Sequence, residues 1–306
     1  MNTPVVILFF NRPEFLRQMI SRLSEVKPKK LYLVCDGPRQ NKCGEEKSVE
    51  ECRKLFDNLN WDCKILRNYS DVNLGCRDRI ISGLDWVFEQ EDRAIILEDD
   101  CIPIVDFFPF AEAMLERYKD NNQIFSVCGT NHCPQKSNIL YDVVFSKYCF
   151  SWGWATWRRA WILMDRHLLR LPEAKKNHLL KRWLGTWRAE WYWSYVLKDD
   201  NSIWDYSWVF TGFIHRGLHI LPSKCLVENI GMMDINATHT TSNPYDLTVI
   251  AKSFSGTYRV PSRVEPDLIF DEWVEDHYFS RALVPRIKWA LKKMHALFRS
   301  KTKNGS

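Results

Sequence analysis

Short apolar stretches alternate with stretches of helical periodicity through the first 131 residues of the chain. Four of the apolar stretches have the length and composition of buried strands: PVVILFF (4–10), KLYLVCD (30–36), CKILRN (63–68) and AIILED (94–99). Between them, apolar residues recur at helical spacing in the segments 12–26, 48–59 and 75–90. This alternation predicts a parallel sheet covered by helices, and therefore an α/β fold.

The pattern changes in the second half of the chain. The expected elements there are a helix at 107–121, a strand at 124–131, an aromatic-rich and less periodic region at 148–208, and a strand within 217–231. A loop-like segment, YRVPSRVEP, then separates these elements from the C-terminal tail. We therefore expect a single domain over residues 1–260, with halves of about 1–131 and 132–260, and a tail over 261–306.

Polar side chains follow each of the four strands predicted in the first half. They are Asn11 and Arg12, Asp36, Asn73 to Gly75, and Glu98 to Asp100. In open α/β sheets, ligands bind beyond the carboxyl ends of the strands. We expect these four groups to line one ligand-binding crevice.

Three consecutive carboxylates, Glu98, Asp99 and Asp100, end the strand AIILE. Like charges at such close spacing repel one another, and a divalent cation would offset the repulsion. Mg²⁺ and Mn²⁺ prefer oxygen ligands, and Mg²⁺ usually bridges one or two protein carboxylates to substrate phosphates. The cluster therefore favours metal-assisted binding of a diphosphate, and the alternative is a solvated acidic turn.

The net charge of +5 narrows the classes of partner. A nucleic-acid-binding protein usually concentrates far more positive charge on one face, so we expect no nucleic-acid partner.

The 10 cysteines form no CxxC pair, and we expect reduced thiols in a cytoplasmic protein. The N-terminal apolar run lacks the features of a signal peptide, and no run has the length of a membrane span. The 14 tryptophans suit either an aromatic core or stacking on sugar rings.

Residues 281–303 contain basic residues and no acidic ones. Val284, Ile287, Leu291 and Met294 recur there at helical spacing, which predicts a basic amphipathic C-terminal helix. Such a helix could bind anionic lipid head groups, placing the protein at the inner face of the cytoplasmic membrane. The alternative is a terminal helix that packs on the domain and leaves its basic face in water.

The order of these features resembles that of the glycosyltransferase A-type fold, a Rossmann-like fold that binds nucleotide sugars. The resemblance is to N-acetylglucosaminyltransferase I and its bacterial relatives. It is carried by AIILEDDCIPIVDFFPFAEAMLERY with IFSVCGTN after it, and by the turns NRPE and CDGPR. It covers roughly residues 3–240. It implies a catalytic domain built on a mixed, mostly parallel sheet flanked by helices, with a nucleotide-sugar half and an acceptor half, and Mn²⁺ or Mg²⁺ held against the donor diphosphate.

The resemblance also implies roles for the acidic cluster. Asp100 matches the carboxylate that ligates the metal directly, while Glu98 and Asp99 would contact the ribose, the donor sugar or metal-bound water. A histidine after the last strand often supplies a metal or phosphate contact in this fold. His239, in ATHT, matches that histidine, although a lone histidine is as often structural.

Further residues match the nucleotide-binding positions of the family. Arg12 and Asp36 match the positions that hold the base, usually uracil, and an aspartate can accept a hydrogen bond from the uracil imide. Asn73, Arg77 and Arg79 lie where the family often contacts the base, ribose or phosphate. For the two arginines, the alternative is a solvated helix face.

The expected catalytic base is Asp205 in IWDYSW, which matches a WDDW loop of the family. An inverting transferase needs one carboxylate to take the proton of the acceptor hydroxyl. The second aspartate of that loop is Tyr206 here, so Asp199 and Asp200 remain alternatives. Trp152 and Trp154 in SWGWATW match the acceptor side, and would either stack on a sugar or fill the core.

The function predicted from the sequence is that of a metal-dependent glycosyltransferase. It would move a hexosyl or N-acetylhexosaminyl group, with inversion, from a UDP-sugar to an oligosaccharide or lipid-linked glycan in surface polysaccharide synthesis. Retaining chemistry on the same fold stays open. A nucleotidyltransferase or a Rossmann oxidoreductase would carry a glycine-rich loop after the first strand, where this chain has FFNRPEF. The other alternative is a non-catalytic carbohydrate- or membrane-binding protein that kept the fold.

Overall fold

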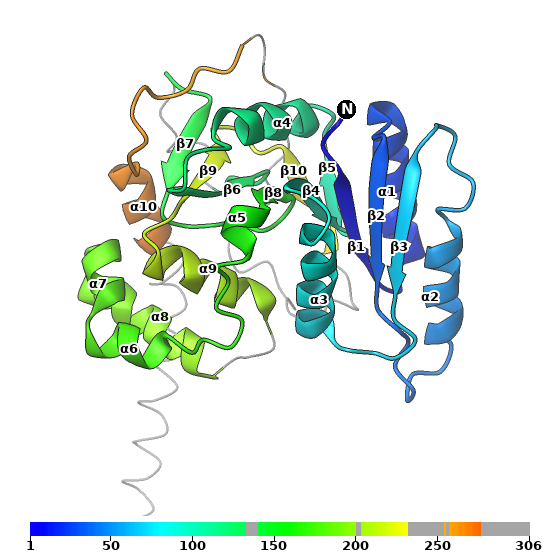
Figure 1. Ribbon diagram of the computed structural model, residues 1–306, viewed down its shortest axis with the longest axis horizontal. Helices are drawn as coiled ribbons and strands as arrows, with labels where there is room; N and C mark the ends of the chain where they lie inside the picture. The colour runs from blue at the N-terminus through cyan, green and yellow to red at the C-terminus, as the bar shows by residue number, and fades with distance from the viewer. Residues whose placement is uncertain (133–139, 200–202, 232–253, 255–256, 277–306) are drawn as a thin grey trace, which may run out of the picture.

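The computed structural model describes residues 1–132, 140–199, 203–231, 254 and 257–276, and Figure 1 shows how their elements are arranged. The strands are β1 (Val5–Phe9), β2 (Lys30–Cys35), β3 (Lys64–Tyr69), β4 (Arg93–Glu98), β5 (Cys101–Pro103), β6 (Ile124–Cys128), β7 (Val143–Ser146), β8 (Trp154–Trp157), β9 (Leu218–Pro222) and β10 (Val227–Asn229). The helices are α1 (Pro13–Val26), α2 (Glu45–Lys54), α3 (Cys76–Phe88), α4 (Phe107–Arg117), α5 (Arg158–Trp161), α6 (Leu171–Lys176), α7 (Leu179–Leu184), α8 (Trp187–Asp199), α9 (Trp204–Ile214) and α10 (Leu268–Val274).

Eight of the strands form one mixed sheet in the order β3-β2-β1-β4-β8-β6-β9-β7. Strands β3, β2, β1 and β4 are mutually parallel, and β8 lies antiparallel between β4 and β6. Strand β9 is parallel to β6, and β7 is antiparallel at the edge. Most strands therefore point the same way, and the predicted mixed, mostly parallel α/β sheet is confirmed.

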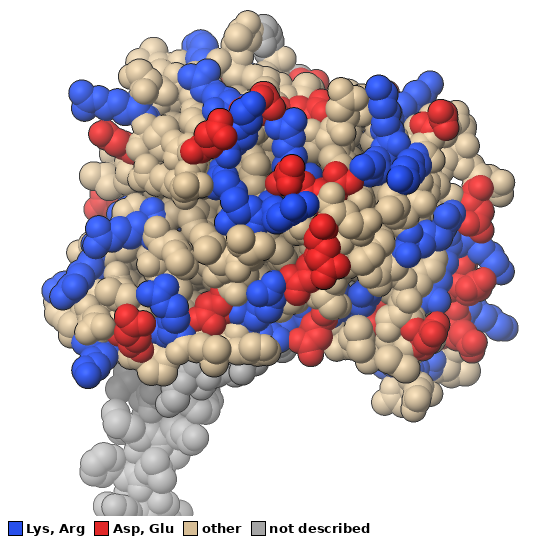
Figure 2. Space-filling model, viewed as in Figure 1, with Lys and Arg blue, Asp and Glu red and all other residues tan. Residues whose placement is uncertain are grey.

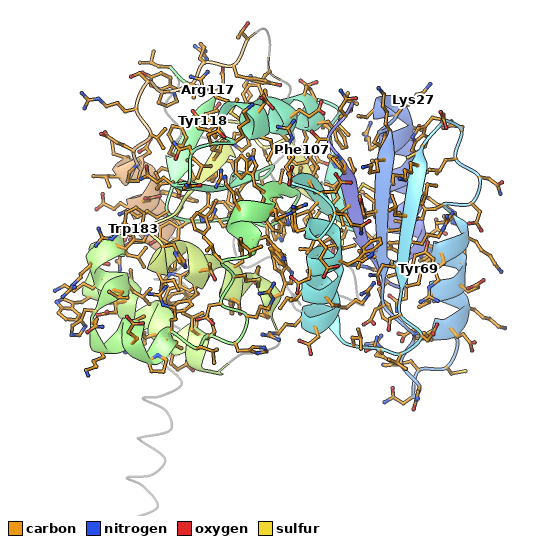
Figure 3. The ribbon with its side chains drawn as sticks, in the orientation of Figure 1. Lys27, Tyr69, Phe107, Arg117, Tyr118 and Trp183 are labelled. Carbon is orange, nitrogen blue, oxygen red and sulfur yellow. The ribbon has the colours of Figure 1, made fainter. Side chains whose placement is uncertain are left out.

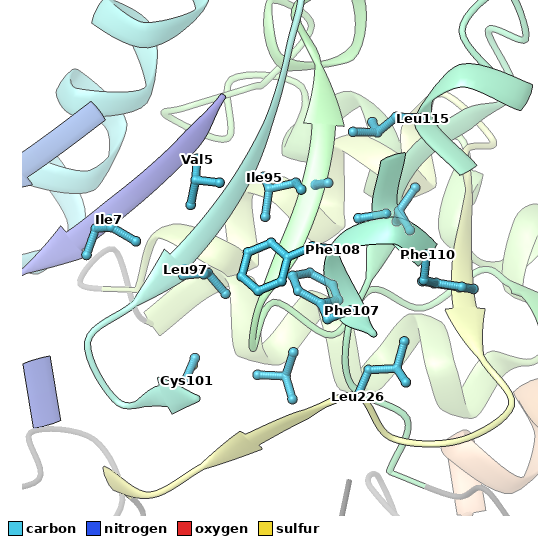
Figure 4. Packing of buried hydrophobic residues seen from close by; sticks show 14 of the residues in the cluster. Val5, Ile7, Ile95, Leu97, Cys101, Phe107, Phe108, Phe110, Leu115 and Leu226 are labelled. Carbon is cyan, nitrogen blue, oxygen red and sulfur yellow. The ribbon is translucent and has the colours of Figure 1, made fainter. Parts of the chain in front are cut away.

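Strand alternation distributes the apolar side chains of the sheet between two helical layers. On one face, Val5 and Ile7 of β1 belong to the core cluster that contains the apolar residues of α1, α2 and α4. Figure 4 shows Phe107 and Phe108 of α4 packed against this face. On the other face, Val6 belongs to the cluster that contains α3 and the tryptophans of α5 and α9. Both faces are covered, as a mostly parallel sheet requires.

The less periodic region at 148–208 contains strand β8 and helices α5 to α8, none of which the sequence resolved as separate elements. All four residues of β8 are buried, because the strand lies in the middle of the sheet between two helical layers. It therefore lacks the polar–apolar alternation that marks a half-exposed strand. Helices α6 to α10 enclose a second core, and Figure 3 shows Trp183 of α7 in this helical region.

Helix α10 packs on strand β7 through a buried carboxylate, Asp271. Its Oδ1 accepts hydrogen bonds from Ser146 Oγ at 2.5 Å and from Lys147 N at 3.3 Å. Burial raises the pKa of Asp271 to about 7, although the hydrogen bond from Ser146 and the charge of Lys147 oppose the shift. The folded chain therefore holds a proton here that the unfolded chain loses near pH 4.

We expect Asp271→Asn to remove a pH-dependent loss of stability. Between about pH 4 and pH 7 the folded state binds the extra proton, so the free energy of unfolding of the wild type falls by about 1.4 kcal/mol per pH unit. The neutral amide does not titrate. Urea unfolding of both proteins should show the wild type losing stability relative to the variant up to pH 7, with a constant difference above it. A difference that does not vary with pH would contradict the assignment.

No helix of the described part is both long and apolar enough to cross a membrane. The predicted basic amphipathic helix within 281–303 lies outside the described residues.

Candidate functional site

The acidic cluster lies at the carboxyl end of β4, beside β1. Glu98 is the last residue of β4 and is in register with Leu8 of β1. Asp99 N donates to Leu8 O at 3.0 Å, which begins the turn into β5. Strand β10 pairs antiparallel with β5 and returns the chain to this point, where Ile230 N donates to Asp100 O at 2.9 Å. The cluster is therefore held from both sides by backbone hydrogen bonds.

Arg12, directly after β1, is the counter-ion of the acidic cluster. Its guanidinium donates to Asp99 Oδ1 through Nη2 and to Asp100 Oδ2 through Nη1, the latter at 2.9 Å. The other oxygen of Asp99 accepts from Phe10 N at 3.3 Å. Asp99 is 2% exposed, so its hydrogen bonds are made in a poorly solvated place. The structure thus brings Arg12 together with the cluster, as the strand-end pattern predicted.

The cluster carries more negative charge than Arg12 offsets. Burial raises the pKa of Asp99 to about 6, against the opposing charge of Arg12. The pKa of Glu98 lies well above its ordinary value because of burial first, and then because of the charges of Asp100, Asp205 and Asp99. Both shifts mean that burial and mutual repulsion disfavour the ionised carboxylates, a cost that a bound cation would lower.

Asp205 reaches this cluster from the other half of the chain. It lies half-buried in the first turn of α9, where the helix dipole favours a negative charge, and accepts a hydrogen bond from Ser151 Oγ at 3.3 Å. Its charge helps to raise the pKa of Glu98. The predicted base is thus within electrostatic range of the predicted metal-binding carboxylates.

Asp36 and Asn73 hold the loop that leads into α3. The Asp36 carboxylate accepts from the backbone N–H groups of Gly37 at 2.9 Å, Leu74 at 2.9 Å and Gly75 at 3.0 Å. Asn73 Nδ2 donates to Gly37 O at 2.8 Å. These hydrogen bonds join the ends of β2 and β3, and Asp36 directly shapes the loop there.

Arg77 and Arg79 of α3 make contacts within the protein. Arg79 is buried, and its guanidinium donates to Cys35 O at 3.1 Å and to Asn68 Oδ1 at 2.8 Å. Arg77 donates to Asp78 Oδ1 at 2.7 Å and to the carbonyl of Arg166. Arg79 therefore ties α3 to the ends of β2 and β3, and Arg77 ties it to the segment after α5. Neither shows the solvated helix face that was the alternative.

The two tryptophans of SWGWATW differ in burial. Trp154 is fully buried in the core between α5 and α9. Trp152 is half-buried, and the ring centroid of His132 lies 4.7 Å from its own. Trp154 therefore fills the core, and Trp152 remains the candidate for stacking on a sugar.

His239 and Asp200 lie outside the described residues, as does the side chain of Asp199.

Gly231 is a site residue that sequence reasoning missed. It follows β10, and a Cβ on it would lie 2.3 Å from Asp100 Oδ2 and 2.8 Å from Asp100 Cβ. A side chain here would push against the carboxylate that the pattern assigns to the metal. The only signal in the sequence was the stretch ENIG, whose pairing with β5 the pattern did not reveal.

We expect Gly231→Ala to displace the Asp100 side chain and to weaken cation-dependent nucleotide binding by about tenfold, a loss of about 1.4 kcal/mol. Overpacking of this kind typically also destabilises the fold by about 1–3 kcal/mol. Calorimetric titration with UDP and Mn²⁺ would measure the loss. In the background of Asp100→Asn the same substitution should cost no further affinity, because interacting sites are not additive. A further tenfold loss of affinity in that background would mean that Gly231→Ala does not act through Asp100.

A divalent cation fits the chemistry of the cluster. Among the described residues, no three His, Cys, Asp or Glu side chains are grouped so as to hold a metal ion by themselves. Mg²⁺ commonly uses only one or two carboxylates and completes its shell with water and substrate phosphates. Glu98 and Asp100 supply two carboxylates, and the charge of Asp100 contributes, after burial, to raising the pKa of Glu98.

Comparison with known proteins gave only distant similarities. No family model and no curated protein matches the chain. A mannosyltransferase, PcManGT from Pyrobaculum calidifontis in complex with GDP-Man and Mn²⁺, has 11% identity and a TM-score of 0.37, over 69% of each chain. S. aureus TarS has 13% identity and a TM-score of 0.38, over 74% of this chain and 36% of its own. A UDP-glucose pyrophosphorylase complexed with UDP-glucose has 9% identity and a TM-score of 0.26, over 49% of this chain and 65% of its own. At such TM-scores, the roles of individual residues rest on the contacts of this chain alone.

Proposed function

We propose that the chain is a metal-dependent glycosyltransferase that uses a nucleotide diphosphate sugar. The observation that carries the proposal is the run of three carboxylates, Glu98 to Asp100, at the carboxyl end of β4. Two of them pair with Arg12, and Asp205 lies within electrostatic range of Glu98. A site with this excess of negative charge favours a bound cation, and the cation in turn attracts the negative charge of a diphosphate. The resemblance to the glycosyltransferase A-type fold supports the same proposal.

Asp100 and Glu98 would hold Mn²⁺ or Mg²⁺, with His239 as the further ligand that the resemblance implies. When bound, the cation would neutralise the charge that develops on the nucleotide diphosphate as it leaves. Arg12 would keep the Asp100 carboxylate oriented through its hydrogen bond to Oδ2. Because Asp99 is bonded on both oxygens, its part in this proposal is to hold Arg12.

The loop between β3 and α3 is the proposed seat of the nucleotide base. Asp36 and Asn73 shape this loop, and Asp36 retains acceptor capacity because each carboxylate oxygen has two lone pairs. It could therefore accept the imide N–H of uracil while it holds the loop. Arg79 would support this loop through its hydrogen bonds to Cys35 and Asn68 at the ends of β2 and β3. Arg77 is the residue proposed to bind the ribose or a phosphate.

Asp205 is the proposed general base. It would take the proton of the acceptor hydroxyl as that oxygen attacks the anomeric carbon, which inverts the configuration there. Its position in the first turn of α9 favours the ionised carboxylate that a base must be. Trp152 is the proposed stacking surface for an acceptor sugar of an oligosaccharide or lipid-linked glycan. The use of such an acceptor in surface polysaccharide synthesis, on the cytoplasmic side, is part of the same proposal.

A thermal-shift screen of nucleotide sugars with and without Mn²⁺ tests the proposal. A ligand that binds only the folded state stabilises it by about 2.7 kcal/mol at a concentration of 100 Kd. We expect UDP and one UDP-sugar to raise the melting temperature only when Mn²⁺ is present. If no nucleotide shifts it under either condition, the donor-site assignment fails, and a non-catalytic carbohydrate-binding role is favoured.

A further inference from the structure

Helix α8 presents a stripe of aromatic side chains to solvent. Trp187, Trp191 and Tyr195 lie four residues apart along the helix, on one face, and are 57%, 54% and 41% exposed. The rings of Trp191 and Tyr195 stack, with centroids 5.9 Å apart. We call these three residues the aromatic stripe. Soluble proteins scatter single exposed aromatics over their surfaces, whereas a contiguous set indicates an interaction surface.

The three residues of the aromatic stripe lie outside the buried core of the helical region. The opposite face of α8 carries the buried residues Ala189, Trp193, Val196 and Leu197, which belong to the core of the helical region. Helices α6 and α7 pack against α8 and hold it in place. Trp187 also contacts the ring of His178, with centroids 4.9 Å apart, so the stripe is displayed on a helix that its neighbours hold in place.

Basic residues are numerous in the helices that carry and adjoin the aromatic stripe. Residues 170–195 contain six Lys and Arg against two Glu, a net charge of +4 where the whole chain has +5. One of the two acids, Glu190, is buried and bonded to His178 Nδ1 at 3.0 Å. Lys176 and Arg182 are exposed, and neither has an acidic partner within ion-pair distance in the part of the chain that the structure describes. Lys181 Nζ lies 3.6 Å from the ring centroid of Trp187, so charge and aromatic surface adjoin. Figure 2 shows Lys and Arg side chains at the lower left of the view, over α6 to α8.

We propose that the α6–α8 surface docks on the face of an anionic phospholipid bilayer. Trp and Tyr rings settle at the level of lipid head groups, because one part of each ring is apolar and another is polar. Lys and Arg beside them attract anionic head groups over a Debye length. Leu169, 77% exposed just before α6, adds an aliphatic side chain to the same region. A soluble polyanion would satisfy the basic residues and leave the aromatic stripe in water.

Charge disfavours the other occupants of this surface. The 30 residues that follow Asp276 contain eight Lys and Arg and no Asp or Glu. The chain enters this segment beside α8, since Arg188 Nη2 donates to Asp276 Oδ1 at 2.6 Å. A segment of such charge is repelled by the α6–α8 surface, as is the same surface of a second copy. The C-terminal segment and the α6–α8 surface would instead both be attracted to the same anionic lipid layer. The lipid contact therefore does not depend on the tail alone.

Co-sedimentation of the full chain with vesicles tests the proposal, using phosphatidylcholine alone and phosphatidylcholine mixed with phosphatidylglycerol. The charge variant is Lys176→Glu with Arg182→Glu, and the aromatic variant is Trp187→Ala with Trp191→Ala. The matched control is Lys42→Glu with Lys47→Glu, two exposed residues at and before α2, far from α6–α8 in Figure 1. All six side chains are wholly or largely outside the core, and melting temperatures check that each variant is folded.

We expect the wild type and the control to bind the anionic vesicles, and neither to bind phosphatidylcholine alone. Because each basic residue near the surface is worth roughly a fivefold change in affinity, the charge variant should lose at least about 25-fold. The aromatic variant should lose binding as well, although its charge is unchanged. If the wild type, the charge variant and the aromatic variant bound the vesicles equally, the proposal would be overturned and lipid binding assigned to the tail.

Two other results would also overturn it. An equal loss in the control and the charge variant would mean that only the total charge matters. If the aromatic variant kept its vesicle binding and lost binding to a neutral oligosaccharide, the stripe would be a sugar-stacking surface. None of these readouts involves sugar transfer, so failure here and failure of the proposed enzymatic function are distinguishable.

Discussion

Asp205→Asn should leave donor binding intact and reduce sugar transfer by about 10²–10⁴-fold, the range that general base catalysis typically contributes. The amide can still accept a hydrogen bond from Ser151 Oγ, so the first turn of α9 should keep its place. It cannot take a proton. Transfer from a radiolabelled nucleotide sugar, measured beside nucleotide binding by calorimetry, separates the two effects.

The matched controls for this prediction are Asp199→Asn and Asp200→Asn, the two acids that the sequence offered as alternatives. Both should transfer normally if Asp205 is the base. Wild-type transfer by the Asp205 variant, with loss in either control, would move the base to the end of α8. Loss of nucleotide binding in the Asp205 variant would give this residue a part in the donor site, since its charge acts on Glu98.

Asp100→Asn should abolish the Mn²⁺-dependent part of nucleotide binding. The side chain is half-buried, fixed by Arg12 and crowded by Gly231, so its carboxylate is held in one orientation. The amide oxygen can still accept from Arg12, and removal of one charge lowers the repulsion on Glu98. We therefore expect the melting temperature without ligand to stay the same or rise, while the Mn²⁺-dependent shift with UDP disappears. At 100 Kd that shift represents about 2.7 kcal/mol.

Asp120→Asn is the control, because this exposed acid after α4 has the same chemistry and lies outside the cluster. It should bind UDP and Mn²⁺ as the wild type does. An unchanged Mn²⁺-dependent shift in Asp100→Asn would remove the metal from Asp100. A fall of the unliganded melting temperature by itself would make Asp100 a structural residue.

Most elements of the first half were predictable, as was a strand where β9 lies, whereas β8 and helices α5 to α8 were not, for a physical reason. Strands β1 to β4 alternate with helices of clear period, and this local alternation predicts a parallel sheet with helices on its faces. Strand β8 is buried on both faces and inserts between β4 and β6 from a distance of many residues along the chain. No local pattern encodes such a pairing, because tertiary packing determines it.

The candidate site shows the same division. Its location followed from polar residues at strand ends, and Arg12 and the acidic cluster do meet there. The inward bonds of Arg79 and the backbone bonds of Asp36 could not be read from the sequence, because a guanidinium or carboxylate after a strand serves a ligand or a loop equally well. The role of Gly231 could not be predicted from the sequence, because its contact with Asp100 depends on the pairing of β10 with β5.

The place of β8 also determines how the chain can be divided. A fragment ending near residue 131 would contain β4 and β6 and lack the strand that lies between them. The two strands would then present unpaired edges, which are templates for aggregation. The complementary fragment would carry Asp205 without the carboxylates that it faces. The two halves should therefore recover a working site only when they are expressed together, which makes the chain a candidate for split-protein complementation with the break before β7.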